Sequence, residues 1–259
     1  GLVRFTIGHD PKTAPTAESD GTVGRTGATC IGCGAAVELN YIRAQGRAGR
    51  MGRQLMATVA AGKRSRVYMA PNPDHEAAAD VDVPLNVPDG DLPDNPRDFK
   101  TPNYGMLTFA SLFTARQLTS LTTFSDLVSE ARELILQDAL AAGLSEGDRL
   151  EAGGTDAAAY ADAVATYLGF AISRMTNRSS TLCPWDSSTK MEAVLGVFAR
   201  QALPMTWDFA ESNPWGGSGG DYNEDLLWVS RVLDKLEVGR TGFARQSDAK
   251  DAIKRNLLI

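Results

Sequence analysis

A proline-rich segment from Val81 to Asn103 divides the chain into two parts with different hydrophobic patterns. Its prolines are Pro84, Pro88, Pro93, Pro96 and Pro102. Proline lacks a backbone N–H and disfavours helix at its own position and at the residue before it. We therefore predict an extended linker, or a loop draped over the surface, at 81–103. Strand-like runs precede it and helix-like spacing follows it. This predicts an α+β fold, with a small β-rich module at 1–80 and a mainly helical region at 104–259.

Short elements are expected within the β-rich module. Leu2–Ile7 alternates apolar and polar residues, which predicts a strand. Val37–Leu39 predicts a short strand, and Asn40–Arg47 predicts a short helix. Gln54–Ala60 and Arg66–Ala70 read as two strands of a hairpin, because a glycine-containing turn separates them.

Apolar residues in the helical region recur at helical spacing behind recognisable start signals. Thr114 followed three residues later by Gln117 is a capping box, in which each side chain bonds to the other residue's backbone N–H. Four helices are expected: from Thr114 to Gly143, after Thr155, over Lys190–Gln201, and from Asp221 to before Gly239.

Composition narrows the class of protein. The three cysteines are sparse and odd in number, which argues against a disulfide framework and favours a reducing compartment. No apolar run approaches the roughly 18–20 residues that a membrane span needs, and the start of the sequence does not resemble a signal peptide. We predict a cytoplasmic protein that has no membrane partner.

Cys30 and Cys33 form a Cys-x-x-Cys-Gly sequence, the usual knuckle of a zinc ribbon. Tetrahedral zinc needs four ligands, and a ribbon supplies two such pairs. The other candidates are Cys183, His9 and His75, and none of them sits in a second knuckle. The sequence therefore predicts half of a structural zinc site in a zinc-ribbon-like module. The alternative is a pair of free or buried thiols.

A block without acidic residues runs from Leu39 to Pro73. Its seven cations are Arg43, Arg47, Arg50, Arg53, Lys63, Arg64 and Arg66, in a chain whose net charge is −6. Arginine is suited to bidentate contacts with phosphate, so these residues are candidates for binding a nucleic-acid backbone. The alternative is a solvated basic surface that docks on an acidic partner domain.

An aromatic and polar stretch near the C-terminal end is a candidate pocket for a target base. Aromatic rings can stack on bases, and carboxylate and amide groups can read base edges. The candidate residues are Trp207, Asp208, Glu211, Asn213 and Trp215. The glycine-rich run Gly216–Gly220 follows and could form a mobile lid. The alternative is a small aromatic core with capped helix ends.

Several signatures of catalysis are absent from the sequence. It contains no phosphate-binding P-loop, no dinucleotide-binding glycine motif, no nucleophile elbow and no His-Glu-x-x-His. Only two histidines are present, which leaves little scope for acid–base catalysis by histidine. We therefore predict no self-contained active site.

Several stretches nevertheless resemble one family, the bacterial adenine-specific DNA methylases that contain an internal zinc ribbon and an uncharacterised N-terminal conserved domain. The matching stretches are Cys30–Arg66 with Val67–Tyr68, Leu112–Leu118 with Leu121–Thr123, Tyr160–Leu168, Asn177–Trp185 and Arg200–Pro214. Together they extend over nearly the whole chain.

The resemblance implies a function for a larger enzyme. In that family an S-adenosylmethionine-binding motif precedes the ribbon, and a catalytic Asp-Pro-Pro-Tyr motif that holds a flipped adenine follows the matched region. Neither motif occurs here. The apolar end at Leu257–Ile259 is expected to open the strand that leads into the catalytic motif.

We therefore expect an internal segment of an S-adenosylmethionine-dependent DNA adenine N6-methyltransferase, inactive alone. It would contribute the ribbon, with Cys30 and Cys33 as its second zinc knuckle, helices that flank the methyltransferase sheet, and a DNA target-recognition surface. Its partners would be DNA and the remaining methyltransferase domain. The alternative is a non-catalytic zinc-ribbon interaction module of a restriction or phage-defence complex.

Overall fold

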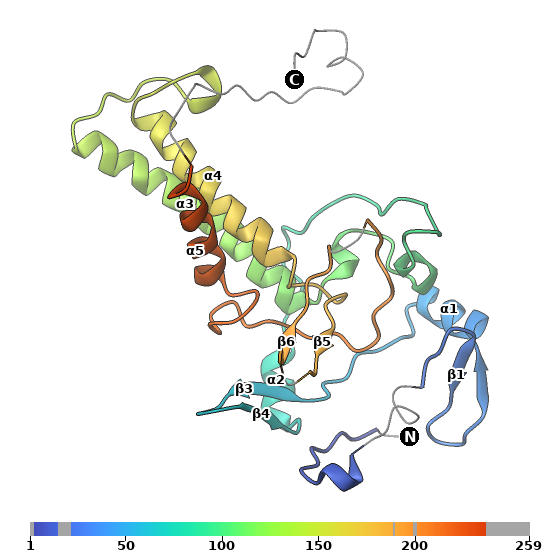
Figure 1. Cartoon of the computed structure of the whole chain (residues 1–259). Helices are drawn as coiled ribbons and strands as arrows, with labels where there is room; N and C mark the ends of the chain where they lie inside the picture. Colours follow the sequence, from blue (N-terminus) through green and yellow to red (C-terminus); the bar gives the residue numbers. More distant parts are fainter. Residues whose placement is uncertain (1–2, 15–21, 189, 199–200, 237–259) are drawn as a thin grey trace.

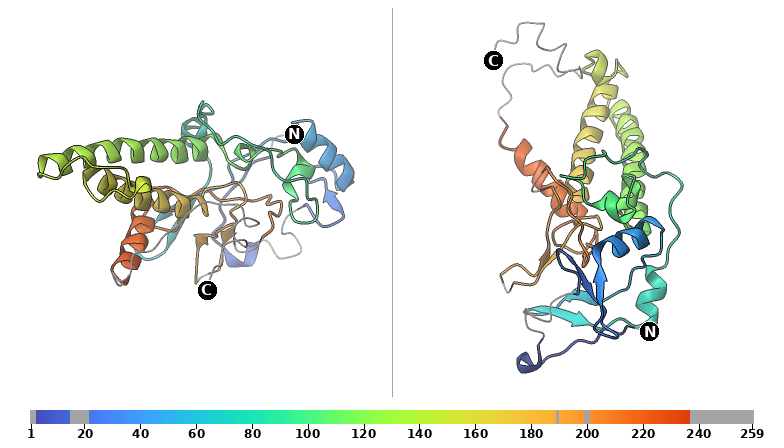
Figure 2. Two further views of the ribbon diagram at one scale, coloured as in Figure 1. Left: turned by 90° about the horizontal axis from the view of Figure 1, so that it is seen from above. Right: turned by 90° about the vertical axis from the view of Figure 1, so that its right-hand side faces the viewer.

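The computed structural model describes residues 3–14, 22–188, 190–198 and 201–236. Helices α3 and α4 form a long antiparallel pair, α5 packs against α4, and the small hairpins of the N-terminal part lie away from the loop that joins α3 to α4 (Figures 1 and 2). The sheets are separate antiparallel pairs, β1 with β2, β3 with β4, and β5 with β6. The predicted α+β class is therefore confirmed.

The N-terminal part consists of two hairpins and two short helices. Its elements after the 3-10 turn η1 (Pro11–Thr13) are β1 (Gly27–Thr29), β2 (Ala36–Glu38), α1 (Leu39–Arg47), β3 (Thr58–Ala61), β4 (Arg66–Met69) and α2 (Pro73–Ala79). The predicted short strand, short helix and hairpin are confirmed, although β3 begins later than expected. The predicted strand at Leu2–Ile7 is wrong over its described residues, because Val3–Ile7 has no strand partner there.

Docking, rather than a core of its own, holds α1 in place. Among the described residues before Leu92, only Gly46 is buried. A Cβ added at Gly46 would overlap the carbonyl oxygen of Tyr104, at the end of the 3-10 helix η3 (Thr101–Tyr104). A Cβ added at Gly105, whose φ is 90°, would in turn overlap the Gly46 carbonyl oxygen. Glycine at both positions lets the two backbones touch.

A tyrosine anchors the β3–β4 hairpin to the second half of the chain. The Tyr68 hydroxyl donates a hydrogen bond of 3.0 Å to Glu192. Its ring lies edge-on to Trp185, with 6.3 Å between centroids. Trp185 belongs to β5 (Trp185–Asp186), which pairs with β6 (Ala193–Val194).

The proline-rich segment forms no α-helix, and its last residues form the 3-10 helix η3. It also contributes to the core. Leu92 is buried in a cluster with Leu112, Leu182 and Leu203. Leu112 ends the 3-10 helix η4 (Ala110–Leu112). Backbone hydrogen bonds join Lys100 N to the Leu203 oxygen (2.9 Å) and Leu203 N to Asp98 (2.8 Å), so the segment packs against the 203 region.

Three of the four predicted helices are confirmed. They are α3 (Ala115–Ala141), α4 (Ala157–Thr176), which the 3-10 turn η5 (Leu150–Ala152) precedes, and α5 (Tyr222–Leu233). Both hydrogen bonds of the Thr114–Gln117 capping box are present. Asp221 caps α5 by accepting from the Glu224 N–H at 3.0 Å.

The predicted helix over Lys190–Gln201 is wrong where the structure describes it. The backbone there bonds sideways to other segments: Leu195 N donates to Pro184 and Val197 N donates to Asn177, both at 2.9 Å. Val194 is buried on β6, so its apolar character reflects packing of a short strand. Residues 189 and 199–200, and the expected strand at Leu257–Ile259, lie outside the described residues.

Candidate nucleic-acid interface and polar pocket

The seven cations of the acid-free block extend from α1 through residues 48–57 to the β3–β4 hairpin, a path visible in Figure 1. We call them the basic track: Arg43, Arg47, Arg50, Arg53, Lys63, Arg64 and Arg66. Arg47, Arg50, Arg53, Lys63 and Arg64 are exposed, whereas Arg43 and Arg66 are half-buried. The structure therefore leaves most of these charges facing solvent.

No member of the basic track has a carboxylate within 4.0 Å among the described residues. In the described part of the chain, every residue that forms an ion pair lies in the sequence range from Arg116 to Asp225, after the proline-rich segment. Arg50 donates instead to the neutral amide of Gln45, at 2.7 Å. The charges of the track are thus available to an external anion.

The middle of the track is an open extended segment. Residues 51–57 make no backbone–backbone hydrogen bond within the described chain, and Met51–Gln54 is exposed. At roughly 3.3 Å per extended residue, seven residues span at most about 23 Å. Duplex DNA presents one negative charge per about 1.7 Å of its axis, so the track can face several phosphates.

One residue of the predicted base pocket is linked to the basic track through a ring that both contact, that of Tyr104. Trp207 lies edge-on to Tyr104, with 5.2 Å between centroids. The Arg43 guanidinium lies 5.8 Å from the centre of the same tyrosine ring, within cation–π range. The Arg43 Nε is buried and has no hydrogen-bond partner in the described chain.

The other residues of that predicted pocket make separate contacts. Trp215 packs on Phe124 at 5.0 Å between centroids, next to the stacked Tyr222, while Trp215 itself stays 62% exposed. Asn213 accepts from the Trp215 N–H at 3.0 Å, and Asp208 is exposed. Glu211 pairs with an arginine of α3, as described below. These contacts do not join the two tryptophans to each other.

Cys30 and Cys33 occupy the turn between β1 and β2. Gly34 N donates to the Cys30 oxygen and Cys30 N donates to the Ala35 oxygen, both at 2.8 Å. The N–H groups of Gly32 and Cys33 lower the pKa of the Cys30 thiol, because they stabilise its thiolate. The turn therefore suits zinc ligation. Among the described residues no third His, Cys, Asp or Glu joins the pair, so the fit is to half a site.

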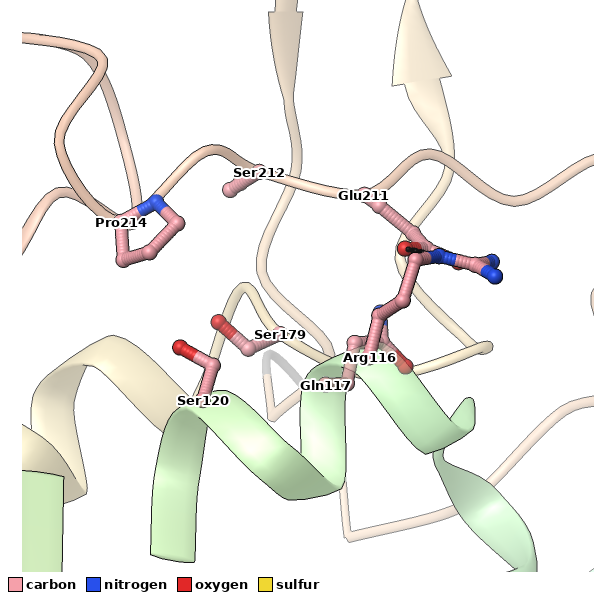
Figure 3. Close-up of a pocket in the computed structure, with 7 residues that line it drawn as sticks. All are labelled: Arg116, Gln117, Ser120, Ser179, Glu211, Ser212 and Pro214. Atoms are coloured by element: carbon pink, nitrogen blue, oxygen red, sulfur yellow. Dashed lines mark hydrogen bonds and ion pairs between the residues drawn. The ribbon is translucent and has the colours of Figure 1, made fainter. Parts of the chain in front are cut away.

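A polar pocket lies at the start of α3 (Figure 3). Its volume is about 210 Å³, and its lining residues are Arg116, Gln117, Ser120, Ser179, Glu211, Ser212 and Pro214. All except Ser120 come from three stretches that were singled out in the sequence, Leu112–Leu118, Asn177–Trp185 and Arg200–Pro214. The fold therefore brings three of these stretches to one place.

Arg116 and Glu211 form the charged side of this pocket. Arg116 donates through Nε and Nη2 to the two Glu211 oxygens, at 2.9 and 2.6 Å, and through Nη1 to the Ala79 carbonyl. The hydrogen bonds to Glu211 raise the pKa of Arg116. Paired in this way, the two groups give the pocket no net charge.

Gln117 forms the buried side of the pocket. Its Oε1 accepts from Thr114 N at 2.9 Å, whereas its Nε2 has no partner in the described chain. An unpaired buried donor typically costs about 1–3 kcal/mol. The sequence identified Gln117 only as a helix cap and did not single out Arg116, because nothing local indicates that Glu211 lies beside them.

Comparison with protein-family models, curated proteins and solved structures gave no match to this chain. No helix among the described residues is long and apolar enough to cross a membrane. Function is therefore inferred from the basic track, the cysteine turn and the polar pocket.

Proposed function

We propose that the basic track binds the phosphate backbone of DNA, and that the chain thereby provides the target-binding part of an S-adenosylmethionine-dependent DNA adenine N6-methyltransferase. The observation that carries the DNA-binding proposal is the set of exposed cations that lack carboxylate partners in the described chain. Their separation along an extended path suits a polyanion better than a compact acidic site.

Such binding has a defined salt dependence. Each phosphate that a cation neutralises releases condensed counterions, and the logarithm of the affinity falls with the logarithm of salt concentration. Five exposed cations correspond to a slope of about −4.5 for B-form DNA. An acidic protein partner would give a different response, because it has no comparable counterion atmosphere.

The methylation part of the proposal has two supports. The motif stretches resemble adenine-specific methylases, and three of them converge on the polar pocket. The S-adenosylmethionine-binding and catalytic motifs would be supplied from outside this sequence, by the methyltransferase domain. Cys30 and Cys33 would provide two thiolates to a structural zinc, which would hold the β1–β2 turn.

Fluorescence anisotropy with a labelled duplex tests the DNA-binding proposal. The variant Arg47→Glu/Arg50→Glu/Arg64→Glu should bind about tenfold or more weakly and lose about 3 from its salt slope. A matched control is Arg97→Glu/Lys190→Glu/Lys235→Glu, because these exposed cations also form no ion pair with a described residue and the change in net charge is the same. An equal loss of duplex affinity in both triple variants would show only an effect of net charge and would contradict DNA binding by the basic track.

A second candidate is a non-catalytic zinc-ribbon interaction module of a restriction or phage-defence complex, favoured by the preformed cysteine turn. Methyl transfer from labelled S-adenosylmethionine to DNA adenine by the intact gene product separates the two. Methylation supports the enzyme proposal. DNA binding without methylation, under conditions where the protein is folded and zinc-loaded, supports the interaction module.

A further inference from the structure

The orientation of the Gln117 amide is fixed by its neighbour. The backbone N–H of Thr114 can only donate, so the oxygen of the Gln117 amide must face it, at 2.9 Å. The NH₂ group therefore points away from the cap, where it has no acceptor among the described residues. Gln117 is only 5% exposed, so water reaches it poorly. Buried donors in native proteins nearly always have a partner, which indicates that one is missing here.

The pocket that Gln117 lines contains a second donor that is unused in the described chain. Ser120 makes no side-chain hydrogen bond within the described chain, so its O–H is free. Ser179 and Ser212 already donate to backbone carbonyls, at 3.0 Å to Met175 and 2.9 Å to Gly219. Both oxygens of Glu211 accept from Arg116.

The local field favours a negative ligand. The Arg116–Glu211 pair has no net charge, and the pocket adjoins the N-terminus of α3, a helix of 27 residues. A helix N-terminus carries a partial positive charge and N–H groups without intrahelical acceptors. The capping box already uses the backbone N–H of Gln117, so the helix contributes its partial positive charge and the side-chain amide of Gln117 supplies the donor.

We propose that this pocket binds a small oxyanion, a phosphate group being the chemistry that fits best. Gln117 Nε2 and Ser120 Oγ would donate to its oxygens, and the N-terminus of α3 would complement its charge. The volume of about 210 Å³ corresponds to roughly seven water molecules at about 30 Å³ each, enough for one tetrahedral anion with some of its hydration. The site does not depend on the basic track, so either proposal can fail alone.

The test is a titration of the purified chain with sodium phosphate, followed by thermal unfolding and by the NMR signal of the Gln117 side-chain amide. Sodium chloride at equal ionic strength is the reference. Phosphate should raise the melting temperature above the chloride reference and shift the Gln117 NH₂ resonance in a saturable manner. A response identical to that in chloride would overturn the proposal.

The variant Gln117→Glu isolates the donor. Glutamate keeps the acceptor oxygen of the capping box, so the helix start is retained, but it replaces the NH₂ group by a carboxylate oxygen. Phosphate binding should weaken about tenfold or more in this variant, and severalfold in Ser120→Ala. Gln137→Glu, exposed on the same helix, is the matched control and should bind as the wild type does. Unchanged binding in Gln117→Glu would contradict the site.

A duplex-binding measurement on the same variants identifies the source of the phosphate group. If it belongs to a DNA backbone, Gln117→Glu should weaken duplex binding severalfold at fixed salt, whereas Gln137→Glu should not. If it belongs to a small molecule, phosphate should still bind and both variants should bind the duplex equally. Both results keep the oxyanion site.

Discussion

Four arginines after the proline-rich segment have surroundings opposite to those of the cations before it. In the helical region Arg116, Arg132, Arg149 and Arg174 each form an ion pair with a carboxylate. In the N-terminal part the cations of the basic track have no such partner among the described residues. The first set joins segments of the fold to each other. The second leaves its charge for something outside the chain.

The two regions also differ in how many of their residues are buried. The buried apolar residues of the described chain lie at Leu92 or later, with Met175 and Ala171 fully enclosed. The earlier part has Gly46 as its single buried residue among those described. The helical region therefore supplies the stability of the fold, whereas the N-terminal part depends on docking. Substitutions should separate these roles.

The largest expected loss of stability follows from truncating the core of the helical region. Met175 is 0% exposed on α4, so Met175→Ala should lower the free energy of unfolding by about 3 kcal/mol through lost burial and a cavity. Urea denaturation measures this. The control Met191→Ala removes a side chain that is 55% exposed and should change stability by less than about 0.5 kcal/mol. Similar losses of unfolding free energy in the two variants would contradict the view that the buried residues of the helical region supply the stability.

Docking of α1 should fail locally when its glycine contact is filled. Gly46→Val places a side chain against the Tyr104 carbonyl, and overpacking of this kind costs about 1–3 kcal/mol. Amide hydrogen exchange should speed up in α1, and Trp207 fluorescence should change, while α3 and α4 stay protected. Gly52→Val is the control, because a side chain there meets no atom within 4 Å. Global unfolding in Gly46→Val would show that the two regions are one cooperative unit.

The ion pairs of the helical region should contribute less, and in a manner that depends on pH. Asp162 accepts from Arg149 at 2.6 Å, Arg132 at 2.7 Å and the Leu150 N–H at 3.1 Å. These groups, Arg149 first, lower the pKa of Asp162 to about 2. A carboxyl whose pKa is lowered on folding stabilises the protein above its unfolded pKa, and that stability disappears as pH falls through the folded value.

The measurement is urea denaturation of Asp162→Asn and the wild type as a function of pH. The variant should lose about 1 kcal/mol at neutral pH, and the difference should vanish between about pH 4 and about pH 2. Asp138→Asn, exposed on α3, should show neither effect. A difference that persists unchanged at low pH would mean that Asp162 acts through packing instead of charge.

The smallest effect on stability is expected in the basic track. Arg47→Ala/Arg50→Ala removes two exposed side chains that form no ion pair with a described residue, so the free energy of unfolding should change by less than about 0.5 kcal/mol. Duplex binding should nevertheless lose about 2 from its salt slope. A substantial loss of stability would show that these charges hold the fold together.

Elements with strong local signals were predictable from the sequence. The Thr114–Gln117 capping box marked the start of α3, and the strand expected after the cysteine pair is present as β2, whereas its partner β1 was not predicted. The helix α2 was missed, although Asn72 caps it and Pro73 opens it, because the run is only seven residues long and has no apolar stripe. The apolar spacing after Lys190 was mistaken for helix, since short buried strands and helical turns share it.

The site was less predictable because it depends on distant segments. Glu211 was expected beside tryptophans on its own stretch, but its charge is satisfied by Arg116, 95 residues earlier in the chain. Trp207 packs edge-on against Tyr104, whose ring also contacts the Arg43 guanidinium, and its own stretch gives no sign of this contact. Local composition shows which side chains can bind a ligand, whereas only the packing of segments shows which of them remain unsatisfied.

The open segment at 51–57 has a further consequence for binding strength. Its ends are fastened to different supports, α1 to η3 through Gly46 and the β3–β4 hairpin to β5 through Tyr68. The cations at the α1 end of the basic track (Arg43, Arg47) and those on the hairpin (Lys63, Arg64, Arg66) form two clusters. Because each cluster is attached to the second half of the chain, the distance between them is restricted. Once the first cluster engages a polyanion, the second binds as an intramolecular step at a raised effective concentration. Long polyanions should thus bind far more tightly than fragments that reach only one cluster.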